Sequence, residues 1–235
     1  MRNQEFSVYF LRKMEYDDSI RTKGNFSFPT PDSQLREERF ILPKLGCIIM
    51  AAGNAARFGD NKLAAELHGR SLILRTLEAV PAERFDQVTV VTQYPEIMDL
   101  AEGFRFSAVR NEHPDYGISH TIRLGLETLQ DCDGAMFLVS DQPLLRRETV
   151  AALVDLWNSR PDQIAALAHG GVRGNPCIFP ARFFPELLAL REDHGGNTVI
   201  RRHEEDLILL EAREEELTDV DTPEAMEELK AESGE

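Results

Sequence analysis

From residue 45 onward, short apolar runs alternate with segments whose apolar residues recur every three or four positions. An apolar run without polar alternation is typical of a strand buried on both faces, whereas the longer period predicts one apolar face of a helix. The predicted strands are 45–51, 87–92, 106–109, 135–139, 163–168, 176–179 and 207–210. The predicted helices are the stripes at 73–80, 118–129 and 150–157 and the segments 184–190, 197–202 and 223–229. This alternation predicts a largely parallel sheet covered on both faces, with ligands bound beyond the carboxyl ends of its strands.

Residues 1–44 follow no such pattern. They mix aromatic and charged residues, include a turn-prone Phe-Pro-Thr-Pro-Asp stretch at 28–32, and show no sustained period. We interpret residues 1–44 as an N-terminal extension of unknown role and residues 45–235 as one domain. Loose packing, pairing with a partner and partial disorder all remain open for the extension.

Composition narrows the range of partners. The 235 residues are 42% hydrophobic, and 41 acidic against 26 basic side chains give a net charge of −15. This balance argues against nucleic acid or an anionic membrane as the main partner, because both need a basic face. The three cysteines form no C-x-x-C pair, which argues against structural zinc and a disulfide framework. With no spanning apolar run and no signal-peptide core, we expect a cytoplasmic protein.

The segment 50–62 directly follows the first predicted strand and is the most informative in the chain. It begins with the small residues Ala51, Ala52 and Gly53. Small residues let the backbone approach a ligand and direct its N–H groups at an anion. Arg57 and Lys62 add a planar guanidinium and an ammonium, which can neutralise a triphosphate. The alternative is an ordinary strand-to-helix turn with a solvated Arg and Lys.

Two familiar phosphate-binding motifs are excluded here. A Walker loop needs Gly, four residues, then Gly-Lys and a hydroxyl residue, whereas Gly53 and Gly59 are separated by five residues and followed by Asp60. The dinucleotide fingerprint G-x-G-x-x-G is also absent from the strand end. The segment is therefore a phosphate loop of a third kind or an ordinary turn.

Carboxylates follow the predicted strand 135–139 and precede the last predicted helix. Asp141 leaves the strand just before a proline, at the edge where the phosphate loop also lies. Mg²⁺ in nucleotide sites is typically held by one or two such carboxylates together with phosphates and waters. Asp219 and Asp221 form a second acidic element, in which we favour Asp221 as the partner of Asp141. The alternative is that Asp141 caps a turn and that Asp221 or Thr222 caps the final helix.

Three loops are further candidates. Gly117 permits close approach of a ligand, and Ser119 either binds the nucleotide or caps the helix that starts there. The turn that contains Gly174, Asn175 and Pro176 forms either the floor of an acceptor site or a simple hairpin turn. The loop 193–197 opens another helix. The six histidines show no metal-ligand spacing.

These motifs occur in one order along the chain. They are Met50-Ala51-Ala52-Gly53 with Arg57 and Lys62, Tyr116-Gly117-Ile118-Ser119, Ser140-Asp141-Gln142-Pro143, Gly174-Asn175-Pro176 and Asp219-Val220-Asp221-Thr222-Pro223. The ordered set resembles the MobA-like nucleotidyltransferases, and within them the molybdenum cofactor cytidylyltransferases. The resemblance covers about residues 45–230.

The resemblance implies a three-layer α/β/α sandwich with a Rossmann-like, mostly parallel sheet of the nucleotide-diphospho-sugar transferase type. It implies Mg²⁺-dependent transfer of CMP from CTP to the phosphate of molybdopterin, with release of pyrophosphate. The implied catalytic residues are Arg57, Lys62 and Asp141, and the implied Mg²⁺ ligands are Asp141 and Asp221. The implied nucleotide-binding residues are Ala51, Ala52, Gly53, Arg57, Lys62, Gly117 and Ser119. The implied acceptor-binding residues are Gly174, Asn175, Pro176 and Asn197.

The choice of nucleotide and acceptor stays open at this point. At the position of Ala52 this chain resembles the cytidylyl enzymes, whereas the guanylyl branch typically has Gly there. Related uridylyl and isoprenoid-pathway enzymes share the Ala-Ala-Gly form, so this residue alone does not decide the nucleotide. The cytidylyl branch has an Arg in the loop where this chain has Asn197, and a small hydroxyl residue where it has His120. A sugar- or alcohol-phosphate acceptor is therefore an alternative, as is a non-catalytic nucleotide- or cofactor-binding maturation protein. A molybdoenzyme partner is compatible with each of these functions.

Overall fold

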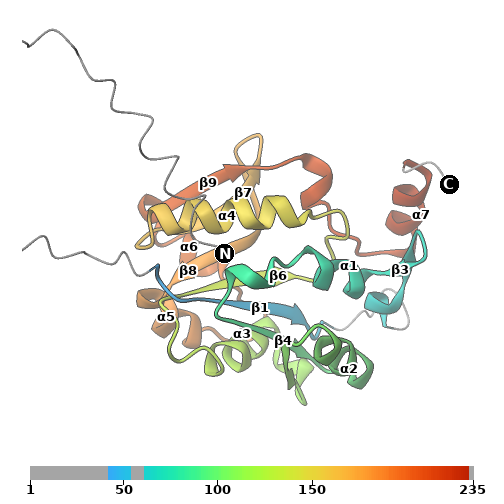
Figure 1. The fold of residues 1–235 in the computed structure, drawn as a ribbon, viewed down its shortest axis with the longest axis horizontal. Helices are drawn as coiled ribbons and strands as arrows, with labels where there is room; N and C mark the ends of the chain where they lie inside the picture. Colours follow the sequence, from blue (N-terminus) through green and yellow to red (C-terminus); the bar gives the residue numbers. More distant parts are fainter. Residues whose placement is uncertain (1–41, 54–60, 233–235) are drawn as a thin grey trace, which may run out of the picture. The chain divides into compact units, whose positions relative to one another are not determined.

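The computed structural model describes residues 42–53 and 61–232, and within them a seven-stranded sheet forms the centre of the fold (Figure 1). The strand order is β5-β4-β1-β6-β8-β7-β9. The strands are β1 (Leu45–Ala51), β4 (Gln87–Thr92), β5 (Ser107–Arg110), β6 (Gly134–Val139), β7 (Ile164–His169), β8 (Val172–Pro180) and β9 (Leu207–Glu211). All neighbouring strands are parallel except β8, which is antiparallel to both β6 and β7. The largely parallel sheet predicted from the sequence is confirmed.

Strand β1 occupies the middle of the sheet, which explains its uninterrupted apolar sequence. Ile48 is level with Thr89 of β4 on one side and with Phe137 of β6 on the other. Successive side chains of a strand point to opposite faces. Cys47 and Ile49 therefore enter one hydrophobic cluster, and Ile48 enters the other.

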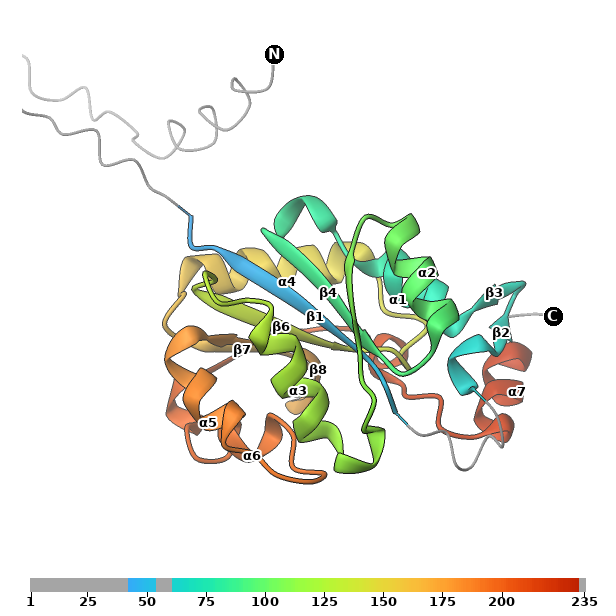
Figure 2. The same cartoon turned by 90° about the horizontal axis from the view of Figure 1, so that it is seen from below.

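Helices cover both faces of the sheet, so the fold is the expected three-layer sandwich. The first cluster contains buried residues of α1 (Leu72–Ala79), α2 (Pro95–Gly103) and α4 (Arg147–Ser159). The second contains buried residues of α3 (Ile118–Glu127), α5 (Phe184–Leu188) and α6 (Asn197–Ile200). In Figure 2, α3, α5 and α6 lie in front of the sheet, with α4 behind it.

A small third cluster joins the last helix to a two-stranded hairpin. The hairpin consists of β2 (Glu66–Leu67) and β3 (Arg70–Ser71), and both views show it beside α7 (Pro223–Glu232). The buried residues of this cluster are Leu67, Leu72, Val220, Met226 and Leu229. Thr222 caps α7 as expected, because its Oγ1 accepts a hydrogen bond from the N–H of Ala225 at 3.2 Å.

The sequence prediction missed the hairpin and α2. The hairpin turn is made by His68 and Gly69, both with positive φ (52° and 70°), the conformation of a tight hairpin turn. Helix α2 has only two buried residues, Ile97 and Ala101, which is too short a stripe to register as a period.

Two further expectations concern the N-terminal extension and membrane-spanning segments. Almost all of the expected extension, residues 1–44, lies outside the described residues, so its separation from the domain stays a prediction. Over the described residues, every helix is too short or too polar to cross a bilayer.

Candidate active site

The carboxyl ends of β1 and β6 open into a cavity of about 460 Å³. It is lined by Met50, Ala52, Gly53, Lys62, Leu63, Pro114, Asp115, Gly117, Ile118, Thr121, Val139, Ser140, Asp141 and Asp193. These residues come from the loops that follow β1 and β6, the start of α3 and a loop after α5. This is the edge at which an open α/β sheet binds ligands.

The start of the predicted phosphate loop is held by the end of the neighbouring strand β4. The side chain of the last residue of β4 and those of the next two residues donate to three successive carbonyl oxygens. The bonds are Thr92 Oγ1 to Ala51 O (2.9 Å), Gln93 Nε2 to Ala52 O (3.1 Å) and Tyr94 Oη to Gly53 O (3.4 Å). A Cβ at Gly53 would meet no atom of the described chain within 4 Å, so this position is open toward the cavity. Residues 54–60, including the predicted triphosphate ligand Arg57, lie outside the described residues.

Lys62 is positioned on a short 3₁₀ turn, Lys62–Ala64. Asn61 caps this turn by accepting a hydrogen bond from the N–H of Leu63 at 3.1 Å, and Leu63 is buried in the first cluster. The Lys62 Nζ lies 3.1 Å from Asp141 Oδ2 and 2.9 Å from Asp221 Oδ1. The two carboxylates predicted from separate parts of the sequence therefore meet at one ammonium group.

The charge of Lys62 is set by competing effects. Burial favours the neutral amine and lowers the pKa of Lys62, but the carboxylates of Asp141 and Asp221 outweigh it and raise the pKa above its ordinary value of 10.5. The side chain is 16% exposed, against 26% for Asp141 and 58% for Asp221. Lys62 is therefore a fixed, partly desolvated cation at the cavity wall.

The second acidic element is tied to the end of β6 by its backbone and by Gln142. The N–H of Val220 donates to the carbonyl of Asp141 at 2.9 Å. Gln142 Nε2 donates to Asp219 Oδ1 at 2.9 Å. Burial, with the nearby charge of Asp141, raises the pKa of Asp219. Asp219 and Asp221 thus have separate partners, and Asp221 shares Lys62 with Asp141.

Helix α3 enters the cavity through Gly117. Gly117 has φ +81°, and a Cβ there would lie 2.4 Å from the backbone carbon of Glu192. Glu192 in turn accepts a hydrogen bond from the N–H of Ser119 at 3.1 Å. The helix begins at Ile118 with Gly117 as its N-cap, so Ser119 does not cap it. The Ser119 side chain is buried and is absent from the cavity lining, and its expected nucleotide contact stays a prediction.

Thr121 lines this cavity instead. Its Oγ1 accepts a hydrogen bond from Asn111 Nδ2 at 3.2 Å, and Asn111 is itself buried. This hydrogen bond links α3 to the residue that directly follows β5.

The charges of the described lining favour a bound cation. This lining includes one cation, Lys62, and three carboxylates, those of Asp115, Asp141 and Asp193. A triphosphate alone would be repelled by this excess of negative charge. The oxygen donors of Asp141 and Asp221 are of the kind that hard divalent cations prefer. The donor set therefore fits the expected Mg²⁺.

A second cavity of about 240 Å³ adjoins the first, because both are lined by Met50, Ile118 and Val139. Three of the predicted acceptor residues, Gly174, Asn175 and Asn197, line it. The fourth, Pro176, is buried in β8 and is absent from the lining. The structure thus gathers these residues beside the first cavity.

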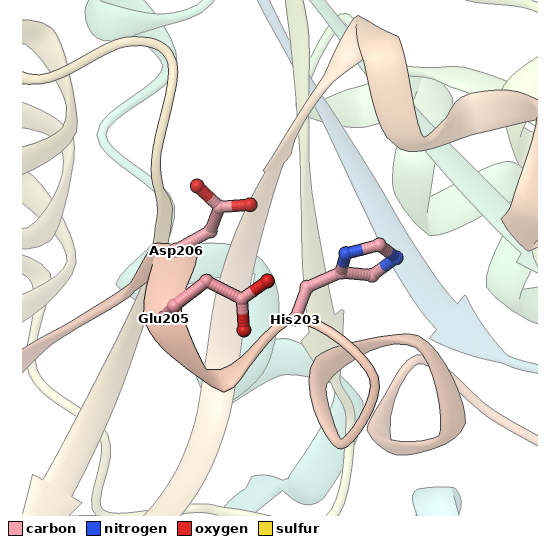
Figure 3. Close-up of side chains that lie close together, drawn as sticks. All are labelled: His203, Glu205 and Asp206. Atoms are coloured by element: carbon pink, nitrogen blue, oxygen red, sulfur yellow. The ribbon is translucent and has the colours of Figure 1, made fainter.

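A separate group of possible metal ligands lies at the end of the sheet opposite to the two cavities. Among the described residues, His203, Glu205 and Asp206 have ligand atoms within 4.8 Å of one another (Figure 3). They directly precede β9, which runs in the same direction as β6, so they lie at the amino ends of the strands. His203 Nε2 is 2.7 Å from Glu186, and Asp206 pairs with Arg182 at 2.8 Å. Two of these three side chains thus already contact other side chains.

Comparison with known proteins agrees with this geometry. The model of the family described as the MobA-like NTP transferase domain matches residues 47–207. The purine catabolism protein PucB of Bacillus subtilis is 29% identical over 195 residues, which cover 77% of this chain and 94% of PucB.

Two solved structures share the fold. A nucleotidyl transferase from Methanothermobacter thermautotroptrophicus has a TM-score of 0.68 at 20% identity, covering 80% of this chain and 97% of its own. Rv0371C from Mycobacterium tuberculosis, in complex with manganese, has a TM-score of 0.61 at 19% identity, covering 80% and 98%. At these identities the likeness shows the fold alone. The family match spans more than half of the chain, and the protein belongs to the MobA-like NTP transferase domain family.

Proposed function

We propose that this nucleotidyltransferase transfers CMP from CTP to the phosphate of molybdopterin, with Mg²⁺ as cofactor and pyrophosphate as the second product. The observation that carries the proposal is the Lys62 ammonium between Asp141 and Asp221 at the wall of the larger cavity. A second cavity opens beside it and offers room for an acceptor.

The proposed site residues would act by positioning and charge. Lys62 and Arg57 neutralise the triphosphate, and the 51–53 backbone donates to its oxygens. Asp141 and Asp221 would hold Mg²⁺, which when bound offsets phosphate charge that the acidic cavity otherwise repels. An oxygen of the acceptor phosphate attacks the α-phosphorus, and the bond to pyrophosphate breaks. The attacking phosphate is already ionised, so no general base is needed and catalysis is mainly alignment and electrostatic stabilisation.

The nucleotide and the acceptor are supported by different evidence. Ala52, at the cavity wall, is the feature that favours CTP over GTP. Molybdopterin is favoured by the family, whose description names MobA. The manganese complex of Rv0371C supports a divalent metal in this fold.

The proposal is tested by pyrophosphate release from each of the four NTPs with Mg²⁺, with and without molybdopterin. We expect release with CTP that requires the pterin. Release only with a sugar phosphate or an alcohol phosphate would replace the acceptor. Tight CTP binding without release for any acceptor would instead favour a binding or maturation protein.

A variant of the metal carboxylate provides a second test. Asp141→Asn preserves size but removes the charge beside Lys62, and we expect transfer to fall at least a hundredfold. The Asp86→Asn variant is less suitable as a control, because Asp86 accepts a hydrogen bond from the N–H of Leu45. Asp99→Asn, on the exposed side of α2, is the matched control. Full transfer by Asp141→Asn at the same melting temperature would rule out the metal role of Asp141.

A further inference from the structure

Five residues of β8 line the smaller cavity, namely Arg173, Gly174, Asn175, Cys177 and Phe179. Because β8 is antiparallel to β6, its first residues lie at the edge where the parallel strands end. The last pair of this ladder toward that edge is Cys177 with Phe137, and Arg173 lies four residues before Cys177. Arg173, Asn175 and Cys177 alternate along the strand and all line the second cavity. From the sequence, this stretch is predicted to be either the floor of an acceptor site or a hairpin turn, and Arg173 is not among the predicted acceptor-binding residues.

Apart from Arg173, the cavity walls are uncharged in the described residues. Its apolar lining is Met50, Ile118, Ile122, Phe137, Val139, Phe179 and Leu187. Gly196 brings the 193–197 loop close to this floor, because a Cβ there would lie 2.9 Å from the Phe179 ring. The larger cavity has an excess of carboxylates, whereas this one combines an apolar floor with a single cation.

The position of the Arg173 guanidinium is set by Asn197. Its Nη2 donates a hydrogen bond to Asn197 Oδ1. Asn197 is neutral, so the contact orients the guanidinium without cancelling its charge, and further donors of the planar fork can bind an anion. The positive charge of Arg173 also acts on Cys177 in the cavity lining. Burial raises the pKa of the Cys177 thiol to about 12, and the charge of Arg173 acts in the opposite direction.

We propose that Arg173, oriented by Asn197, binds the phosphate of the acceptor, and that the acceptor carries a flat ring system that packs one face on the apolar floor. This inference rests on the proposed function and extends it to the acceptor class. A guanidinium is suited to bidentate binding of phosphate. A sugar would leave its hydroxyl groups facing apolar side chains without hydrogen-bond partners, which disfavours a sugar phosphate.

The test measures equilibrium binding and does not depend on turnover. The probes are 6-hydroxymethylpterin phosphate, its unphosphorylated alcohol and glucose 1-phosphate, with wild type, Arg173→Ala and Arg173→Lys. We expect wild type to prefer the pterin phosphate over the alcohol by about tenfold to a hundredfold, the scale of a charge-assisted hydrogen bond. Arg173→Ala should lose this preference, and Arg173→Lys should keep part of it. CTP affinity should stay within about twofold.

Arg201→Ala is the matched control, because Arg201 is exposed and lines neither cavity. An unchanged phosphate preference in Arg173→Ala, or no preference in wild type, would overturn the role of Arg173. Tighter binding of glucose 1-phosphate than of the pterin phosphate would overturn the acceptor class. Failure of the proposed transfer is seen separately, as Arg173-dependent binding without pyrophosphate release.

Discussion

Replacing Lys62 with methionine removes the shared cation of Asp141 and Asp221 and keeps an unbranched side chain. Under the proposed function, the lost ammonium would be one preorganised donor toward the triphosphate of CTP. Removing one such donor typically costs about 2.7–4 kcal/mol of transition-state stabilisation. We therefore expect kcat/KM for CTP to fall by about 10²–10³.

The cost in stability should be much smaller, because the two ion pairs remain partly solvated. Asp141 is 26% exposed and Asp221 is 58% exposed, so solvent screens both contacts with Lys62. Pairs of this kind contribute about 0–1 kcal/mol each. For a domain of this size 1 kcal/mol corresponds to about 2–4 °C, so the melting temperature should fall by no more than about 8 °C.

The assay compares pyrophosphate release at saturating acceptor with thermal unfolding of the same preparation. Lys230→Met is the matched control, since Lys230 pairs with one carboxylate, Glu227, at 2.9 Å on α7. It should retain wild-type kcat/KM. Wild-type activity in Lys62→Met, or a loss of activity explained by unfolding, would refute the role given to Lys62.

Two further predictions concern backbone strain and thiol accessibility. Gly117→Ala should lower the free energy of unfolding by about 1–3 kcal/mol or more, because φ is +81° and the new Cβ would meet the backbone of Glu192. The control Gly103→Ala should change the free energy of unfolding by less than about 1 kcal/mol, and equal urea midpoints for the two variants would contradict this prediction. A thiol reagent at pH 8 should modify the half-buried Cys132 first. Cys47 and Cys177 should react only in denaturant, because they are buried and burial raises the pKa of each thiol. Rapid labelling of all three cysteines in the native protein would contradict the burial of Cys47 and Cys177.

The sequence was sufficient for the central strands and for the edge at which the site lies. Apolar runs such as 45–51 and 135–139 have one physical explanation, burial on both faces, and the residues after them follow the strand ends. The contact of Asp221 with Lys62 could not be predicted in the same way. It depends on the irregular chain between β9 and α7, where Val220 is held to Asp141 by a single backbone hydrogen bond.

The start of β8 shows why strand boundaries near a site escape prediction. Its first residues extend past the last paired residue of β6, Phe137, and they face a cavity in place of a packed core. Side chains that face a cavity need not be apolar, and Arg173 and Asn175 are polar. The sequence of this segment therefore resembles that of a turn. The only available signal was the unusual Arg inside a Gly-rich stretch.

The loop that contains Glu192 contributes residues to the lining of both cavities. Asp193 lines the larger cavity and Gly195 the smaller one, and the Glu192 carbonyl accepts from the start of α3. A displacement of this loop therefore alters both cavities together. Lys62 and Asp141 lie on other segments, the 3₁₀ turn Lys62–Ala64 and the chain just after β6. Changes in acceptor preference should accordingly arise at Arg173 without loss of nucleotide binding, whereas changes at Gly117, which packs against this loop, should affect both substrates.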